Sequence, residues 1–187
     1  MVREDMLLKV KSIFLSLGFV ILLALFSQIK VPLPFTPVPL TLQTFGLLLI
    51  AYYLPFRLAL GSVLLYLLLG ALGFPIFSGG KGGFLILSGP TGGYLIGFFF
   101  MVYLLCFAKE KELLSNPVSS FFIALLGHMV VYLFGSIWFL AGYSQFGLVT
   151  DIKKLLVLTV IPFIPSDIMK CVLFSAFIYT EKKLKRG

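Results

Sequence analysis

Asp167 and Lys170 are an acid and a base inside an apolar segment near the carboxyl end of the chain. Three residues apart on a helix, they would share one face and could form an ion pair. A charged side chain inside a membrane helix costs at least a few kcal/mol, so such residues tend to face a cavity or a partner. The spacing is consistent both with a ligand-binding site and with a structural pair in which Asp167 caps a helix and neutralises Lys170.

Two loops rich in proline and glycine supply further candidate ligand contacts. The prolines of segment 32–44 hold an extended path with few free amide donors, and its Gln43 side chain offers hydrogen bonds. Thr41 is a candidate contact that is equally well explained as a cap of the next helix. In segment 78–94, glycines allow either a close backbone approach to a ligand or simple loop flexibility; the candidates there are Lys81, Gly82, Gly89, Thr91, Gly92 and Tyr94.

The sequence does not favour an enzyme. His128, the single histidine, shares a predicted helix face with Tyr132, and we interpret it as a buried, hydrogen-bonded structural residue. HExxH metal spacing and a GxSxG nucleophile motif are both missing, and the glycine-rich loop lacks the spacing of a phosphate-binding P-loop. We therefore predict no catalytic residues, no bound metal, no cofactor and no ATP binding by this chain itself.

The composition indicates an integral membrane protein. Of 187 residues, 60% are hydrophobic and 12% are charged, whereas an average soluble domain has roughly 25% charged residues. The net charge of +8 does not indicate nucleic-acid binding, because the Lys and Arg residues stand at the ends of apolar segments. Cys106 and Cys171 lie in apolar runs without CxxC spacing, so neither a disulfide nor a zinc site is predicted.

The apolar segments predict an all-α membrane domain of six transmembrane helices over residues 1–187. Since proline starts helices better than it continues them, the last helix should begin between Pro162 and Pro165, with Leu155 to Ile161 as a separate turn or interfacial helix. Asp167 then falls in its first turns, where the helix dipole favours an acid. The expected helices are Ser12 to Ile29, Leu42 to Leu54, Leu58 to Leu72, Gly93 to Ala108, Val118 to Ala141 and Pro162 to Thr180.

The distribution of Lys and Arg predicts the orientation. With six spans both termini lie on one side, and that side carries ten of these cations against four on the other. By the positive-inside rule the termini are cytoplasmic, and the proline-rich and glycine-rich loops face outward from the cell membrane. The four outer cations are Lys30, Lys81, Lys153 and Lys154.

Two pairs of small residues have the four-residue spacing that allows helices to approach closely in lipid. They are Ser12 with Ser16, and Gly93 with Gly97. Packing within the chain is the default explanation for both pairs. Ser12 and Ser16 lie toward the inner half of the first helix, where docking of a partner membrane subunit is the alternative.

Five blocks of sequence closely resemble the BioY family, in the same order and with compatible spacing nearly from end to end. They are 36–45, 64–73, 89–94, 127–132 and 162–170. BioY proteins are the biotin-specific S components of energy-coupling factor (ECF) transporters. The resemblance implies the S-component fold, high-affinity capture of external biotin, and delivery together with a transmembrane coupling subunit and two ATPase subunits.

Two features depart from the family pattern, and one rival function stays open. The family often has Gly where this chain has Ser166, and its helix-contact motif is usually written with alanines where Ser12 and Ser16 stand. The alternative is a self-sufficient secondary vitamin transporter. Such a carrier would usually have more spans and an internal repeat, and neither is visible in this sequence.

Overall fold

The computed structural model describes residues 2–143 and 151–186, and this part of the chain forms the six long helices that the apolar segments predict. Two short helices, α4 (Phe84–Ser88) and α7 (Ile152–Thr159), and a hairpin of strands β1 (Lys30–Val31) and β2 (Leu40–Thr41) complete it. The first helix begins well before Ser12 and the last continues past Thr180, and the other bounds agree within a few residues. The long helices are α1 (Val2–Gln28), α2 (Gln43–Tyr53), α3 (Phe56–Ala71), α5 (Gly92–Glu110), α6 (Pro117–Tyr143) and α8 (Ile164–Arg186).

The helices differ in how much of a bilayer they can cross. Within the described residues, segments 10–28, 92–110 and 117–142 are long and apolar enough to span a membrane, and α7 with α8 forms a bent fourth candidate. Helices α2 and α3 are apolar but have only 11 and 16 residues, about 16 and 24 Å at 1.5 Å per residue. Pro55 separates these two helices, as expected for a tight hairpin.

The prolines divide the carboxyl-terminal segment as predicted. Helix α7 starts after Asp151, whose side chain accepts a hydrogen bond from the backbone N–H of Lys154 at 2.8 Å. The chain then bends by 47° and α8 begins at Ile164. The separate helix is thus confirmed, although it covers 152–159 instead of 155–161, and Asp167 lies in the first turn of α8.

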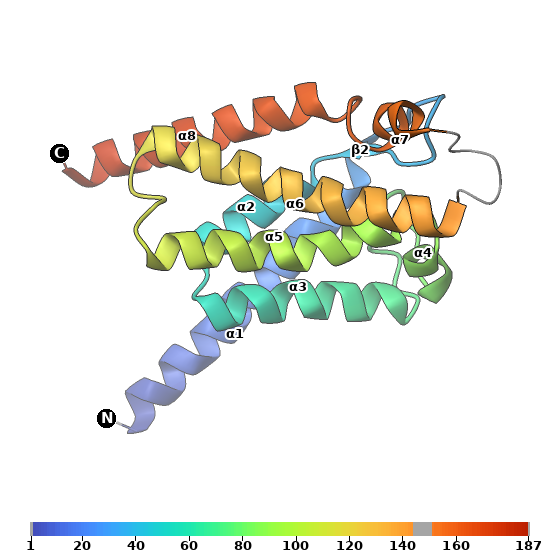
Figure 1. Ribbon diagram of the computed structural model, residues 1–187. Coiled ribbons are helices and arrows are strands. Elements are labelled where there is room, and N and C mark those ends of the chain that lie inside the picture. Colours follow the sequence, from blue (N-terminus) through green and yellow to red (C-terminus); the bar gives the residue numbers. More distant parts are fainter. Residues whose placement is uncertain (1, 144–150, 187) are drawn as a thin grey trace.

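Helix α5 lies at the centre of the bundle, where it packs against α2, α3 and α6, while α6 also packs against α8 (Figure 1). Close approach of α5 and α6 depends on glycine. A Cβ at Gly93 would lie 2.3 Å from the Cβ of Trp138 and 2.4 Å from the carbonyl oxygen of Phe134, and one at Gly97 would lie 3.0 Å from the Cα of Val131. The interpretation of this pair as packing within the chain is confirmed.

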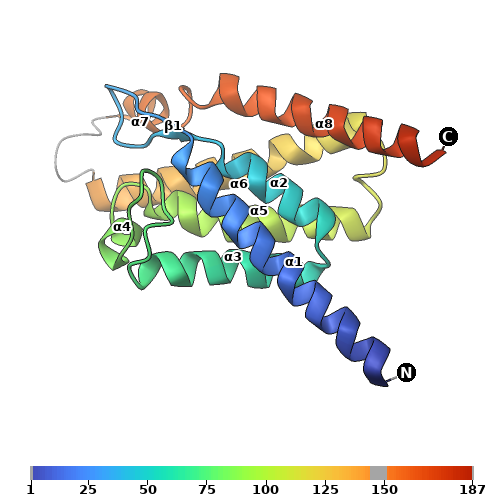
Figure 2. The same ribbon diagram turned by 180° about the vertical axis from the view of Figure 1, so that it is seen from behind.

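The two ends of the bundle are different. The amino and carboxyl termini lie at one end, and the β-hairpin, α4 and α7 gather at the other (Figure 2). In the hairpin, Lys30 pairs with Thr41 and Val31 with Leu40. The proline-rich loop between the strands is fastened to α7, because Thr36 Oγ1 donates to the carbonyl oxygen of Leu158 at 2.8 Å.

Lys109 caps the carboxyl end of α2, although the sequence analysis counts it only as one of the ten cations on the side of the termini. Its ammonium group donates to the carbonyl oxygens of Ala51 at 2.7 Å, Tyr52 at 3.1 Å and Leu54 at 2.5 Å. The last carbonyls of a helix have no partner within the helix itself. A side chain of α5 therefore satisfies the terminal carbonyl groups of α2.

Candidate ligand-binding cavity

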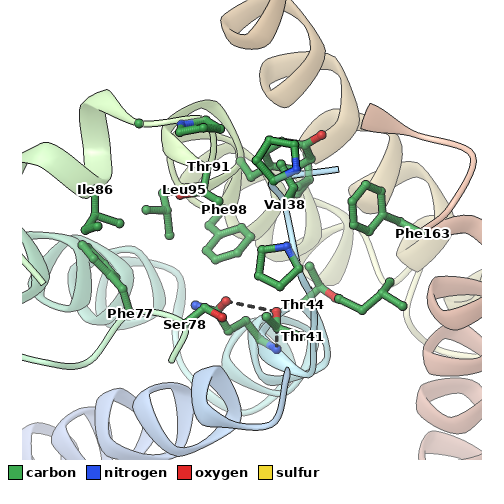
Figure 3. A pocket seen from close by; sticks show the side chains of 18 of the residues that line it. Val38, Thr41, Thr44, Phe77, Ser78, Ile86, Thr91, Leu95, Phe98 and Phe163 are labelled. Atoms are coloured by element: carbon green, nitrogen blue, oxygen red, sulfur yellow. Dashed lines mark hydrogen bonds between the residues drawn. The ribbon is translucent and has the colours of Figure 1, made fainter. Parts of the chain in front are cut away.

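A cavity of about 320 Å³ lies at the end of the bundle that carries the loops. In Figure 3 the rings of Phe77, Phe98 and Phe163 surround the space, and Thr41 and Thr44 lie together on one side. Its walls come from both loops and from α2, α5, α6 and α8. The lining residues are Pro37, Val38, Pro39, Leu40, Thr41, Gln43, Thr44, Phe77, Ser78, Lys81, Leu85, Ile86, Gly89, Pro90, Thr91, Tyr94, Leu95, Phe98, Val131, Tyr132, Phe163, Asp167 and Lys170.

Most of the candidates from the sequence come together here. The structure places eight of the ten predicted site residues in the lining: Thr41, Gln43, Lys81, Gly89, Thr91, Tyr94, Asp167 and Lys170. They come from loops and helices that lie far apart along the chain. The cavity therefore brings together the charged pair, the proline-rich loop and the glycine-rich loop.

Gly82 and Gly92 are not part of the lining, which departs from the sequence prediction. A Cβ on Gly82 would lie 2.2 Å from the carbonyl oxygen of Phe74, and one on Gly92 would lie 1.8 Å from that of Leu87. Both positions thus need glycine because backbone passes directly beside them. The sequence shows that a glycine is present, but it does not show whether a ligand or the protein's own backbone occupies the space where a side chain would lie.

The charged pair forms a buried polar network on the α8 side of the cavity. Lys170 Nζ lies 2.6 Å from Asp167 Oδ1 and donates to Thr44 Oγ1 at 2.9 Å, while Tyr132 Oη donates to Asp167 Oδ2 at 2.5 Å. The side chains of Asp167 and Lys170 are each only 7% exposed. Burial removes the charges from water, so the pair is held by these hydrogen bonds and by its mutual attraction.

Sequence reasoning missed Thr44 and the apolar walls of the cavity. Thr44 follows the candidate Gln43 directly, and Tyr132 was noted only because it shares a face with His128. Both line the cavity and bind the charged pair. The three phenylalanines had no distinguishing signal, because apolar residues that line a cavity look the same in sequence as those that fill a core.

His128 lies behind the carboxylate and does not line the cavity. It is fully buried, and its Nδ1 lies 2.8 Å from the carbonyl oxygen of Ala124. Because a carbonyl only accepts, Nδ1 carries a proton in this arrangement. Nε2 lies 3.6 Å from Asp167 Oδ1 and has no hydrogen-bond partner in the described part of the chain. The prediction of a buried, hydrogen-bonded histidine is confirmed.

Tyr94 and Thr41 each combine a lining role with a structural one. Tyr94 Oη donates to the carbonyl oxygen of Thr159 at 2.8 Å, so its hydroxyl points to α7 and its ring borders the cavity. Thr41 Oγ1 accepts from the backbone N–H of Gln43 at 3.4 Å and donates to Gln43 Oε1 at 3.0 Å. Thr41 thus lines the cavity, and its contact with a ligand stays a prediction. The N-cap of α2 is Leu42, so the expected capping by Thr41 is wrong, although Thr41 contacts the first residue of the helix.

The cavity has the character of a small-molecule site with a few placed polar groups. Among residues 2–143 and 151–186, no group of three His, Cys, Asp or Glu side chains is arranged to hold a metal ion. The polar groups that face the space are carboxylate, ammonium, hydroxyl and amide. Such groups recognise a ligand that both donates and accepts hydrogen bonds.

Comparison with known proteins identifies the family. A family model described as the BioY family matches residues 2–186. The chain belongs to the BioY family. A probable biotin transporter BioY from Pyrococcus horikoshii is 37% identical over 175 residues, which cover 94% of this chain and 97% of that protein. The biotin transporter BioY of Thermotoga maritima is 35% identical over 156 residues, which cover 83% and 87% of the two chains.

A solved structure supports the same assignment. The crystal structure of the S component for biotin from an ECF-type ABC transporter superposes with a TM-score of 0.82 and is 28% identical to this chain. The match covers 94% of this chain and 92% of that one. The fold predicted from the resemblance to BioY, an all-α S component of the membrane, is confirmed, and this BioY protein is a membrane transport protein and not an enzyme.

Proposed function

We propose that this chain captures biotin in the cavity beside Asp167 and Lys170. Biotin combines a ureido ring that donates and accepts hydrogen bonds with an apolar thiophane ring and a carboxylate tail. The cavity offers counterparts to each, since aromatic walls lie beside a buried carboxylate and a buried ammonium group. Asp167 accepts from the ureido N–H, and Lys170 meets either the ureido carbonyl or the carboxylate. The observation that carries the proposal is this buried pair at the cavity of a BioY protein.

Purification without added vitamin, followed by mass spectrometry of the released small molecules, tests the substrate. We expect biotin in a ratio near one per chain, because a buried, preformed site releases its ligand slowly. A different vitamin in the same ratio would retain the capture role and overturn the biotin assignment. Protein denatured before washing serves as the control for nonspecific carry-over.

The orientation and the partners belong to the same proposal. The end that carries the termini faces the cytoplasm, because most of the Lys and Arg residues gather there. The loops and the cavity then open toward the outside of the cell membrane. A coupling subunit docks on the inner half of α1, where Ser12 and Ser16 are half-buried and Ile13 and Phe14 are 55% and 71% exposed. Two ATPase subunits supply the energy.

Transport in vesicles separates this proposal from the rival secondary carrier. With this chain alone in the membrane, we expect biotin to bind and not to accumulate, because the sequence has no nucleotide-binding motif. Adding the coupling subunit, both ATPases and ATP should start uptake. Full-rate uptake by the chain alone, driven by an ion gradient, would refute the S-component role and support the secondary transporter.

A further inference from the structure

A second buried polar network contacts the cavity through Gln43. It joins the last turn of α1, the middle of α3, the loop after α3 and the start of α2. Its side chains are Ser27 and Tyr66, both fully buried, and Gln43, which is 4% exposed. Ser27 and Tyr66 both contact the backbone carbonyl of Ile76, and Gln43 contacts the hydroxyl of Tyr66. Buried polar groups that are fully satisfied by one another tend to hold a single arrangement.

Counting donors fixes the direction of the hydrogen bonds that join Tyr66, Gln43 and Thr41. Tyr66 Oη lies 2.9 Å from the carbonyl oxygen of Ile76, which only accepts, so the single phenolic proton is used there. The hydroxyl oxygen must therefore accept from its other neighbour, the Nε2 of Gln43, at 2.7 Å. The Gln43 amide consequently turns its oxygen toward Thr41, whose hydroxyl donates to Oε1 at 3.0 Å.

The ring of Tyr66 also supports the cavity wall. It packs edge-on against Phe77 with ring centroids 5.5 Å apart, and Phe77 lines the cavity. Phe77 in turn lies so close to α3 that a Cβ on Gly70 would be 2.1 Å from its ring. Ser27 Oγ lies 2.7 Å from the same carbonyl oxygen of Ile76 and 2.6 Å from that of Ala24, so its single proton is shared between the loop and α1. One tyrosine thus contacts both a polar and an apolar lining residue.

From this geometry we infer that Tyr66 is a positioning residue of the ligand site. It does not line the cavity, and it acts through Gln43. Its hydroxyl sets the orientation of the Gln43 amide, and so decides where the α2 wall presents a hydrogen-bond donor and where it presents an acceptor. A site with a fixed pattern discriminates strongly against analogues that lack the matching group. The identity of the ligand as biotin rests on the proposed function, whereas the orientation of Gln43 does not.

Replacement of Tyr66 by Phe tests the binding side of the inference. Tyr66→Phe keeps the ring against Phe77 and removes the group that accepts from Gln43. We expect biotin affinity to fall roughly tenfold, the effect of one buried hydrogen bond left unmade. Tyr103→Phe is the matched control, since Tyr103 is 49% exposed on α5 and does not line the cavity. It should bind biotin as the unmodified protein does.

A double-mutant cycle with Gln43→Leu distinguishes positioning from general support of the fold. If Tyr66 acts through Gln43, Tyr66→Phe should cost little additional affinity once Gln43→Leu is present. An equal loss in both backgrounds would overturn the inference. The inference would also be overturned if the unmodified protein binds biotin and folded Tyr66→Phe binds it with the same affinity.

A measurement without ligand keeps the two proposals separate. The protein is labelled with ¹⁵N-glutamine, and the signal of Gln43 is the one that disappears in Gln43→Leu. The side-chain amide protons of Gln43 should exchange slowly with water in the unmodified chain and faster in Tyr66→Phe. Equal exchange in both proteins would overturn the positioning role, whether or not biotin binds. Failure of the unmodified protein to bind biotin, with slow exchange lost in Tyr66→Phe, would instead refute the proposed function and support the positioning role.

Discussion

Asp167→Asn should weaken biotin binding on the order of a hundredfold or more, as measured by titration of the purified protein. The carboxylate accepts from Lys170 and from Tyr132 in a buried site. An asparagine has no charge and only one accepting oxygen, so Lys170 would be left as a buried ammonium without its counter-ion. Removing one partner of a buried, hydrogen-bonded charged contact across a binding interface costs about 2–5 kcal/mol, and here that contact is the one proposed between Asp167 and the ureido N–H of biotin. The loss of the Asp167–Lys170 pair itself lowers the stability of the fold as well.

Asp151→Asn is the matched control, because it is the same substitution at the same end of the molecule. Asp151 is exposed and caps α7, and asparagine is as good a helix cap as aspartate. Biotin affinity should therefore stay unchanged. If folded Asp167→Asn binds biotin as tightly as this control does, Asp167 has no direct part in ligand binding and the pair is structural.

Lys109→Met should destabilise the folded protein by about 3 kcal/mol, seen as a lower midpoint of unfolding in detergent. Methionine retains much of the apolar stem but has no donors for the carbonyl groups of Ala51, Tyr52 and Leu54. Each buried carbonyl without a partner costs about 1–3 kcal/mol. Water that enters at the helix end offsets part of the combined cost of the three carbonyl groups.

Lys111→Met provides the comparison for the loss of one positive charge at the same end of α5. Lys111 is exposed, and its ammonium lies 5.7 Å from the centre of the Phe107 ring. An exposed contact of this kind contributes about 0.5–1 kcal/mol. A shift in the unfolding midpoint that is equal in both variants would mean that net charge, and not the capping of α2, accounts for the effect of Lys109.

Helix positions were predictable because the bilayer imposes a length and a polarity on every span. The six apolar segments therefore locate the helices, and Pro162 and Pro165 locate the break before α8. The Asp167 and Lys170 pair was also predictable, since charges are rare enough in such segments to stand out. Their spacing of three residues on a helix leads directly to the observed ion pair.

The remaining features depend on which helix faces meet, and a hydropathy pattern does not contain this information. Tyr66 looks like any apolar residue of α3 until Gln43 and the carbonyl of Ile76 are brought beside it. Lys109 was counted by its place in a loop, although its long side chain reaches back to α2. Gly79, Gly80 and Gly83 have φ between +69° and +100°, so the turn itself explains these glycines without a ligand.

The short helix α7 links the parts that cover the cavity. An isolated helix of eight residues is too short to be stable in water, and the last carbonyls of α7 find partners outside the helix. Leu158 accepts from Thr36 of the proline-rich loop, and Thr159 accepts from Tyr94 of α5. Because each of these elements stabilises the others, we expect α7 and the proline-rich loop to open as one cooperative unit. Amide hydrogens of α7 and of the strands β1 and β2 should accordingly share a single opening free energy.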